Sequence, residues 1–93
     1  MPQDEAEAIA VAALSYLAED VGLASRFLAL SGLEASDLRR AAQDPAFLAG
    51  LLDFVAGHEQ VLIALAARTG RSVAEIERAR RLLSDEEDER QST

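Results

Sequence analysis

His58 is the only histidine of this 93-residue chain, which contains no cysteine. Disulfides, thiol catalysis and Cys-ligated metal sites are therefore excluded, and a single histidine lacks the partners that a general base or a zinc site needs. Its place between Gly57 and Glu59 predicts that it caps a helix or lies exposed. No Gly-rich phosphate-binding loop occurs. We expect a protein that is not an enzyme and holds no cofactor or metal.

Asp53 interrupts an apolar segment, between Leu52 and Phe54. It lies one step off the main apolar stripe of the expected helix, which favours a place on the polar face. The alternative is a buried carboxylate, which would need an arginine partner such as Arg26 or Arg68.

Residues 65–83 have the phasing of a helix-turn-helix motif, with Gly70 at the turn. In that reading Arg71, Arg78 and Arg81 would meet phosphates or base edges. The alternative is an ordinary helical hairpin whose solvated face carries ion pairs such as that of Glu77 with Arg80 or Arg81. Nucleic-acid binding is possible but is disfavoured by the charge of the chain.

The net charge of −8 comes from the two ends. Residues 1–19 and residues 84–93 each contribute −4, whereas residues 20–83 carry eight acidic and eight basic residues and sum to zero. An acidic chain disfavours nonspecific binding to nucleic acid or to anionic membranes. The longest apolar stretch is too short to span a bilayer and follows acidic residues, so no membrane association and a cytoplasmic location are expected.

Nineteen alanines, fourteen leucines and only two prolines predict an all-α fold. We expect one compact bundle of five to six short helices over residues 1–83, followed by a disordered acidic tail over residues 84–93. Glycine stops, N-cap residues and apolar spacing place the helices at about 5–19, 21–30, 35–43, 45–56, 59–69 and 73–83. The helix over 45–56 is expected to form the core, with Phe47 and Phe54 contributing most to stability.

Two stretches resemble each other at an offset of 38 residues, Phe27–Ala41 and Leu65–Ala79. Each contains an expected helix, a glycine stop, a short turn and an acidic residue in the next helix. They are interpreted as two pseudo-repeated helical hairpins that both pack on the helix between them, with chance resemblance among Ala-rich and Leu-rich helices as the alternative.

The first helix is apolar nearly all round, which is typical of a central helix or of an interface. It therefore offers the candidate surface for a protein partner or for a homodimer. The candidate residues are Ile9, Val11, Leu14, Tyr16 and Leu17. Core packing of the same residues is the alternative.

The runs FLALSGLEASDLR (Phe27–Arg39) and DPAFLAGLLDF (Asp44–Phe54) resemble a family of short, uncharacterised alphaproteobacterial proteins, catalogued as a domain of unknown function. The resemblance spans roughly residues 10–83 and implies a small, all-helical cytoplasmic protein. It implies no activity, ligand or site residue, and His58 departs from the acid or asparagine expected at its position. The leading hypothesis is a non-catalytic protein-interaction or adaptor module. The alternative is a nucleic-acid-binding regulator that uses residues 65–83.

Overall fold

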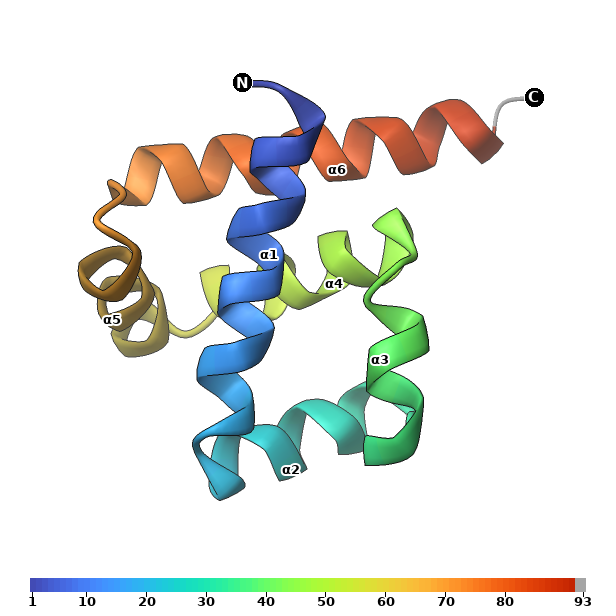
Figure 1. Ribbon diagram of the computed structural model, residues 1–93, viewed down its shortest axis with the longest axis vertical. Coiled ribbons are helices and arrows are strands. Elements are labelled where there is room, and N and C mark those ends of the chain that lie inside the picture. The colour runs from blue at the N-terminus through green and yellow to red at the C-terminus, as the bar shows by residue number, and fades with distance from the viewer. Residues whose placement is uncertain (92–93) are drawn as a thin grey trace.

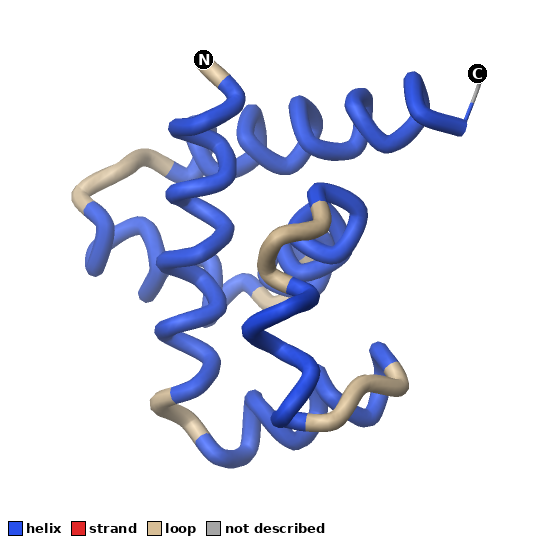
Figure 2. Tube along the Cα trace, turned by 45° about the vertical axis from the view of Figure 1, so that its right-hand side comes forward, coloured by secondary structure: helices blue, strands red, loops and turns tan. Residues whose placement is uncertain are grey.

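The fold is built from helices alone over the part of the chain that the structure describes. The computed structural model describes the backbone of residues 1–91 and the side chains of residues 1–85. Its elements are α1 (Gln3–Ala18), α2 (Val21–Ser31), the 3-10 turn η1 (Ala35–Asp37), α3 (Leu38–Ala41), α4 (Pro45–Ala56), α5 (Glu59–Thr69) and α6 (Val73–Gln91). Short loops join them (Figure 2). The all-α, single-domain prediction is confirmed.

The helix starts follow local rules that the sequence shows. The side chain of Asp20 accepts the Leu23 N–H at 3.2 Å, and that of Asp44 accepts the Ala46 N–H at 3.0 Å. At the start of α6, Ser72 Oγ accepts the Glu75 N–H at 3.1 Å while the Glu75 carboxylate accepts the Ser72 N–H at 3.2 Å. These side chains satisfy N–H groups that have no partner inside the helix. The predicted caps of α2, α4 and α6 are confirmed.

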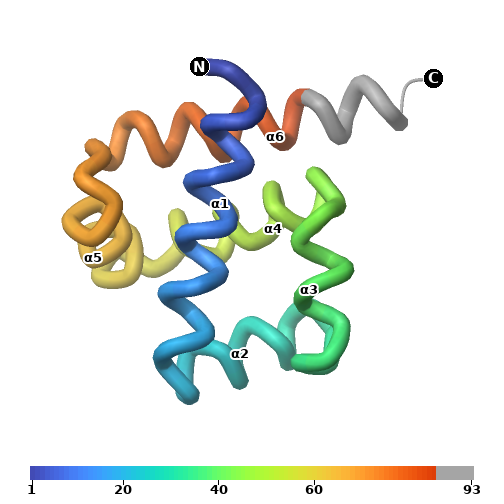
Figure 3. Tube along the Cα trace, viewed as in Figure 1, coloured from blue at the N-terminus to red at the C-terminus, as the bar shows by residue number. Residues whose placement is uncertain are grey.

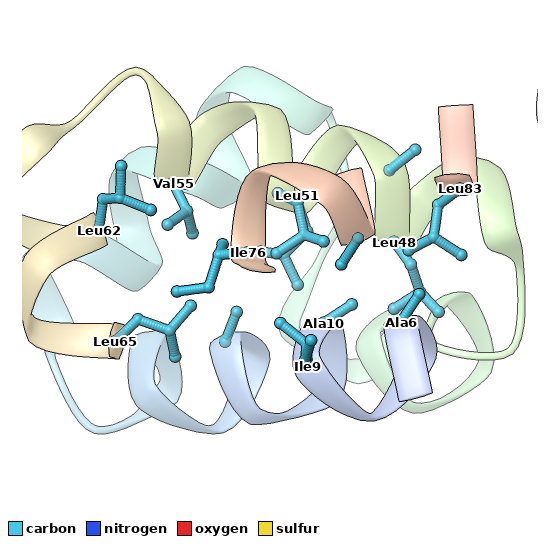
Figure 4. Close-up of a cluster of buried hydrophobic side chains, with 14 of the residues drawn as sticks. Ala6, Ile9, Ala10, Leu48, Leu51, Val55, Leu62, Leu65, Ile76 and Leu83 are labelled. Atoms are coloured by element: carbon cyan, nitrogen blue, oxygen red, sulfur yellow. The ribbon is translucent and has the colours of Figure 1, made fainter. Parts of the chain in front are cut away.

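The core lies where α1, α4 and α6 pack on one another, with α5 closing one end (Figures 1 and 4). On α1 the buried face is narrow, because Ala6, Ala10 and Ala13 follow a stripe at helical spacing and are almost fully buried. Small side chains on this stripe allow neighbouring helices to approach α1 closely. The large side chains that fill the centre are aliphatic: Ile9, Leu17, Leu48, Leu51, Leu52, Val55, Leu65, Ile76 and Leu83.

The aromatic residues do not form the centre of this core, contrary to the prediction for α4. Phe47 and Phe54 are only half-buried, whereas Leu48, Leu51 and Leu52 are at most 1% exposed. The helix presents its aliphatic face to α1 and α6 and turns its two phenylalanines toward α2. Helix α4 is central as expected, but aliphatic side chains, and not Phe47 and Phe54, fill its buried face.

The predicted repeat holds at its two glycines and at the acidic residue that follows each of them, because Asp37 accepts the Glu34 N–H and Glu75 accepts the Ser72 N–H, both at 3.2 Å. Gly32 and Gly70 both end their helices in the left-handed conformation, with φ of 76° and 70°. Beyond them the copies differ, because the first continues into η1 and the four-residue α3, and the second into the 19-residue α6. Figure 3 shows α2 and α3 at the end of the molecule away from α6. The two hairpins therefore do not flank α4 in equivalent ways.

Helix α6 also ends later than the sequence predicted. Its backbone is helical to Gln91, well past Leu83, where the sequence predicts the end of the helix. The disorder expected of residues 84–93 stays a prediction. The side chains of residues 86–91, and Ser92 and Thr93 entirely, lie outside the described residues. Two apolar side chains whose helical spacing is that of core residues are exposed instead: Leu30 at 72% and Val73 at 39%.

Candidate partner-binding pocket

An apolar pocket opens between α2 and α4, outside the aliphatic core. It has a volume of about 540 Å³, within the range typical of ligand-sized clefts. Leu30 and Asp53 line it at the surface, since Leu30 is 72% exposed and the Asp53 side chain is 57% exposed. Its lining residues are Phe27, Leu30, Ser31, Leu33, Phe47, Gly50, Asp53 and Phe54.

All three phenylalanines of the chain line this pocket. The Phe27 ring, on α2, meets the two rings of α4 edge to face. Its centroid lies 5.7 Å from that of Phe47 and 5.4 Å from that of Phe54, with interplanar angles of 72° and 67°. Edge-to-face pairs at these distances are favourable beyond the area that they bury. The aromatic cluster therefore joins α2 to α4 while leaving apolar surface open to a partner.

Behind the pocket, His58 fixes the end of α4. Its ring lies 4.4 Å from the Phe54 ring centroid to centroid, and its Nδ1 lies 2.8 Å from the Phe54 carbonyl oxygen. A carbonyl oxygen only accepts, so Nδ1 carries the hydrogen and donates it. The backbone of His58 is the N-cap of α5, but its side chain makes no hydrogen bond to that helix. The side chain therefore donates to a backbone carbonyl in the last turn of α4 and does not cap α5.

At the rim of the pocket, Asp53 shares an arginine with a second carboxylate. Arg80, on α6, donates from Nη1 to Asp53 at 3.0 Å and from Nη2 to Glu77 at 3.1 Å. Hydrogen bonds to Glu77 and then to Asp53 raise the pKa of Arg80 above its ordinary value. The predicted Glu77–Arg80 pair and the exposed position of Asp53 are confirmed. The partner of Asp53 is neither Arg26 nor Arg68.

The candidate partner-binding residues of α1 are divided between core and surface. Ile9 and Leu17 are 2% and 1% exposed and belong to the core, so they offer no surface in this fold. Leu14 and Tyr16 are half-buried against the core, and Val11 is 45% exposed. The Arg68 guanidinium lies over the Tyr16 ring, 5.6 Å from its centroid, and pairs with Glu19. The apolar character of α1 is therefore mostly explained by packing.

The three arginines of the helix-turn-helix hypothesis are not equivalent. Arg71 pairs with Glu5 of α1 and lies 3.3 Å from Glu75. The hydrogen bond to Glu5 is the largest cause of the raised pKa of Arg71. Arg78 and Arg81 are exposed on α6. The structure thus leaves two of the three free to meet an anion and holds the third in a contact within the chain.

The sequence does not predict this pocket, because apolar spacing favours a place in the core for Phe27, Leu30, Phe47 and Phe54. Their spacing on α2 and α4 is that of core residues. The composition is the feature of the sequence that points to this pocket. The aliphatic side chains alone are sufficient to fill the centre of the core, so the aromatic side chains can lie on another surface.

No group of three or more histidine, aspartate or glutamate side chains among the described residues is placed to hold a metal ion. Within the same part of the chain, no single helix is both long and apolar enough to cross a membrane.

Comparison with known proteins gives a family but no activity. A family model described as "Protein of unknown function (DUF3572)" matches residues 3–86. No curated protein and no solved structure matches the chain.

Proposed function

The chain belongs to this family of unknown function, and from the geometry of its surface we propose that it is a non-catalytic, cytoplasmic interaction module. A protein partner binds in the pocket between α2 and α4. This proposal keeps the class of function expected from the sequence but moves the binding surface from α1 to the pocket.

The observation that carries the proposal is the placement of the aromatic side chains. Three phenylalanines surround one open pocket, next to a leucine that is 72% exposed, while the core is filled by aliphatic residues. Exposed apolar surface costs free energy in water, about 25 cal/mol per Å², which is recovered when a partner covers it. Aromatic side chains are also enriched at the centres of protein interfaces.

The test compares two lysine substitutions on the same helix. Leu30 and Val21 are both strongly exposed on α2, at 72% and 80%, but only Leu30 lines the pocket. Because neither side chain is buried, both Leu30→Lys and Val21→Lys should fold like the wild type. We expect Leu30→Lys to lower the recovery of a specific partner at least about tenfold, which corresponds to about 1.4 kcal/mol. Val21→Lys should retain that partner.

The measurement is quantitative mass spectrometry of proteins captured from nuclease-treated native lysate by the three purified baits. Circular dichroism of each bait checks that it is folded. Partners that remain bound to Leu30→Lys at the wild-type level would contradict the proposal.

Nucleic-acid binding through α6 is the second candidate, because Arg78 and Arg81 are exposed one turn apart. It predicts that omitting the nuclease recovers nucleic acid with the wild-type bait, and that Arg78→Ala reduces this recovery. Binding of that kind would also weaken steeply with salt.

A further inference from the structure

We infer that the partner segment entering the pocket is an amphipathic helix that places a lysine or arginine beside Asp53. This inference rests on the proposed function and specifies the chemistry of its partner. It follows from the charged side chains at the rim of the pocket, because the Asp53 carboxylate is more exposed than its partner Arg80.

Among the residues that the structure describes, Asp53 is the only ionisable one that lines the pocket. Its arginine partner is shared, since Arg80 also binds Glu77, so the three side chains together carry a net charge of −1. The carboxylate is also the more accessible member of the contact. The Asp53 side chain is 57% exposed, whereas those of Arg80 and Glu77 are 29% and 30% exposed. A partner at the pocket therefore meets an incompletely neutralised carboxylate next to apolar rings.

The charge of the whole chain favours the same kind of partner. With a net charge of −8, the protein attracts cationic segments and repels anionic ones during encounter. A second copy would bring another −8 and a second Asp53 to the same surface, so charge argues against a homodimer through the pocket. It argues equally against a phosphate backbone there.

A helix suits the pocket because two helices form its walls. Amphipathic helices bind in such grooves through apolar side chains at helical spacing, and their flanking residues reach the rim. A volume of about 540 Å³ leaves room for neighbouring anchors from the same face of one helix. The apolar anchors would pack against Phe27, Phe47 and Phe54, and the adjacent basic residue would meet Asp53.

The test uses three synthetic helical peptides that share one stripe of leucines and differ in the residues that flank it: lysine, glutamine or glutamate. Binding to the full chain is measured by isothermal titration calorimetry at low salt. We expect the lysine peptide to bind at least about threefold more tightly than the glutamate peptide, as for an exposed ion pair. In the Asp53→Asn variant, the ratio of the affinities for the lysine and glutamate peptides should fall toward one.

Asp4→Asn is the matched control. It changes the net charge by the same amount at an exposed position on α1 that does not line the pocket. It should preserve most of the preference for lysine. An equal decrease in both variants would show that net charge, and not Asp53, sets the preference, and would overturn the inference.

Three other outcomes would also overturn it. The first is equal affinity for the three peptides, and the second is no binding of any of them. The third is a wild-type dimer in sedimentation experiments that Leu30→Lys dissociates, which would make a second copy the occupant. The proposed function is judged separately: a captured partner lost in Leu30→Lys would still support binding at the pocket if the peptides showed no charge preference.

Discussion

Leu51→Ala is expected to lower the free energy of unfolding by about 3–5 kcal/mol. Leu51 is fully buried on α4, at the centre of the packing shown in Figure 4, and no side chain there can move far enough to fill the space that it leaves. A domain of this length typically has about 5–14 kcal/mol of stability. The substitution therefore removes a large part of the total, and urea denaturation followed by circular dichroism measures it.

Phe54→Ala is the comparison for this prediction. The larger side chain is half-buried and faces the pocket, so its removal leaves a wider open surface and not a closed cavity. Phe54→Ala should therefore lower the free energy of unfolding clearly less than Leu51→Ala does. Equal losses, or a greater loss in Phe54→Ala, would show that the aromatic cluster belongs to the stabilising core.

Gly70→Ala should destabilise the protein by about 1–2 kcal/mol. At φ of 70°, a β-carbon lies too close to the backbone, although nothing else in the structure would be within 4 Å of it. The cost is therefore conformational and not a clash with a neighbour.

Gly50→Ala is the matched control, with the opposite sign expected. Gly50 lies inside α4, and the space around an added β-carbon is also empty. Alanine should stabilise this helical position by about 0.5–1 kcal/mol. Thermal unfolding of both variants gives the two signs directly. A Gly70→Ala protein as stable as the wild type would contradict the role of the left-handed turn.

Much of the fold was predictable because local rules decide it. The N-caps Asp20 and Asp44, the reciprocal pair of Ser72 and Glu75, and the glycine stops act within a few residues of each other. All the residues that take part in each of these local contacts lie in one short stretch of sequence, so the contacts can be predicted without the fold. The existence and approximate bounds of most helices followed from them. The exceptions are the extension of α6 and the helix expected at about 35–43, which is the 3-10 turn η1 followed by the four-residue α3.

The pocket was less predictable because it depends on which apolar face meets which helix. Leu30 has core-like spacing on α2, yet it is 72% exposed, and Phe27, at 6% exposed, is the one buried residue of this helix. Spacing identifies an apolar face but not what covers it. The partner of Asp53 was missed for the same reason: Arg80 lies 27 residues away in sequence, and only the packing of α4 against α6 brings the two together.

The alanine stripe of α1 also limits which substitutions this helix accepts. At Ala6, Ala10 and Ala13 the fold selects for small volume more than for hydrophobicity, because the space beside each β-carbon is already occupied. Glycine would keep the close approach at a cost of about 0.5–1 kcal/mol in helix propensity, whereas leucine, which is more apolar, would force α1 away from its neighbours. Hydropathy alone would therefore misjudge which substitutions this helix accepts.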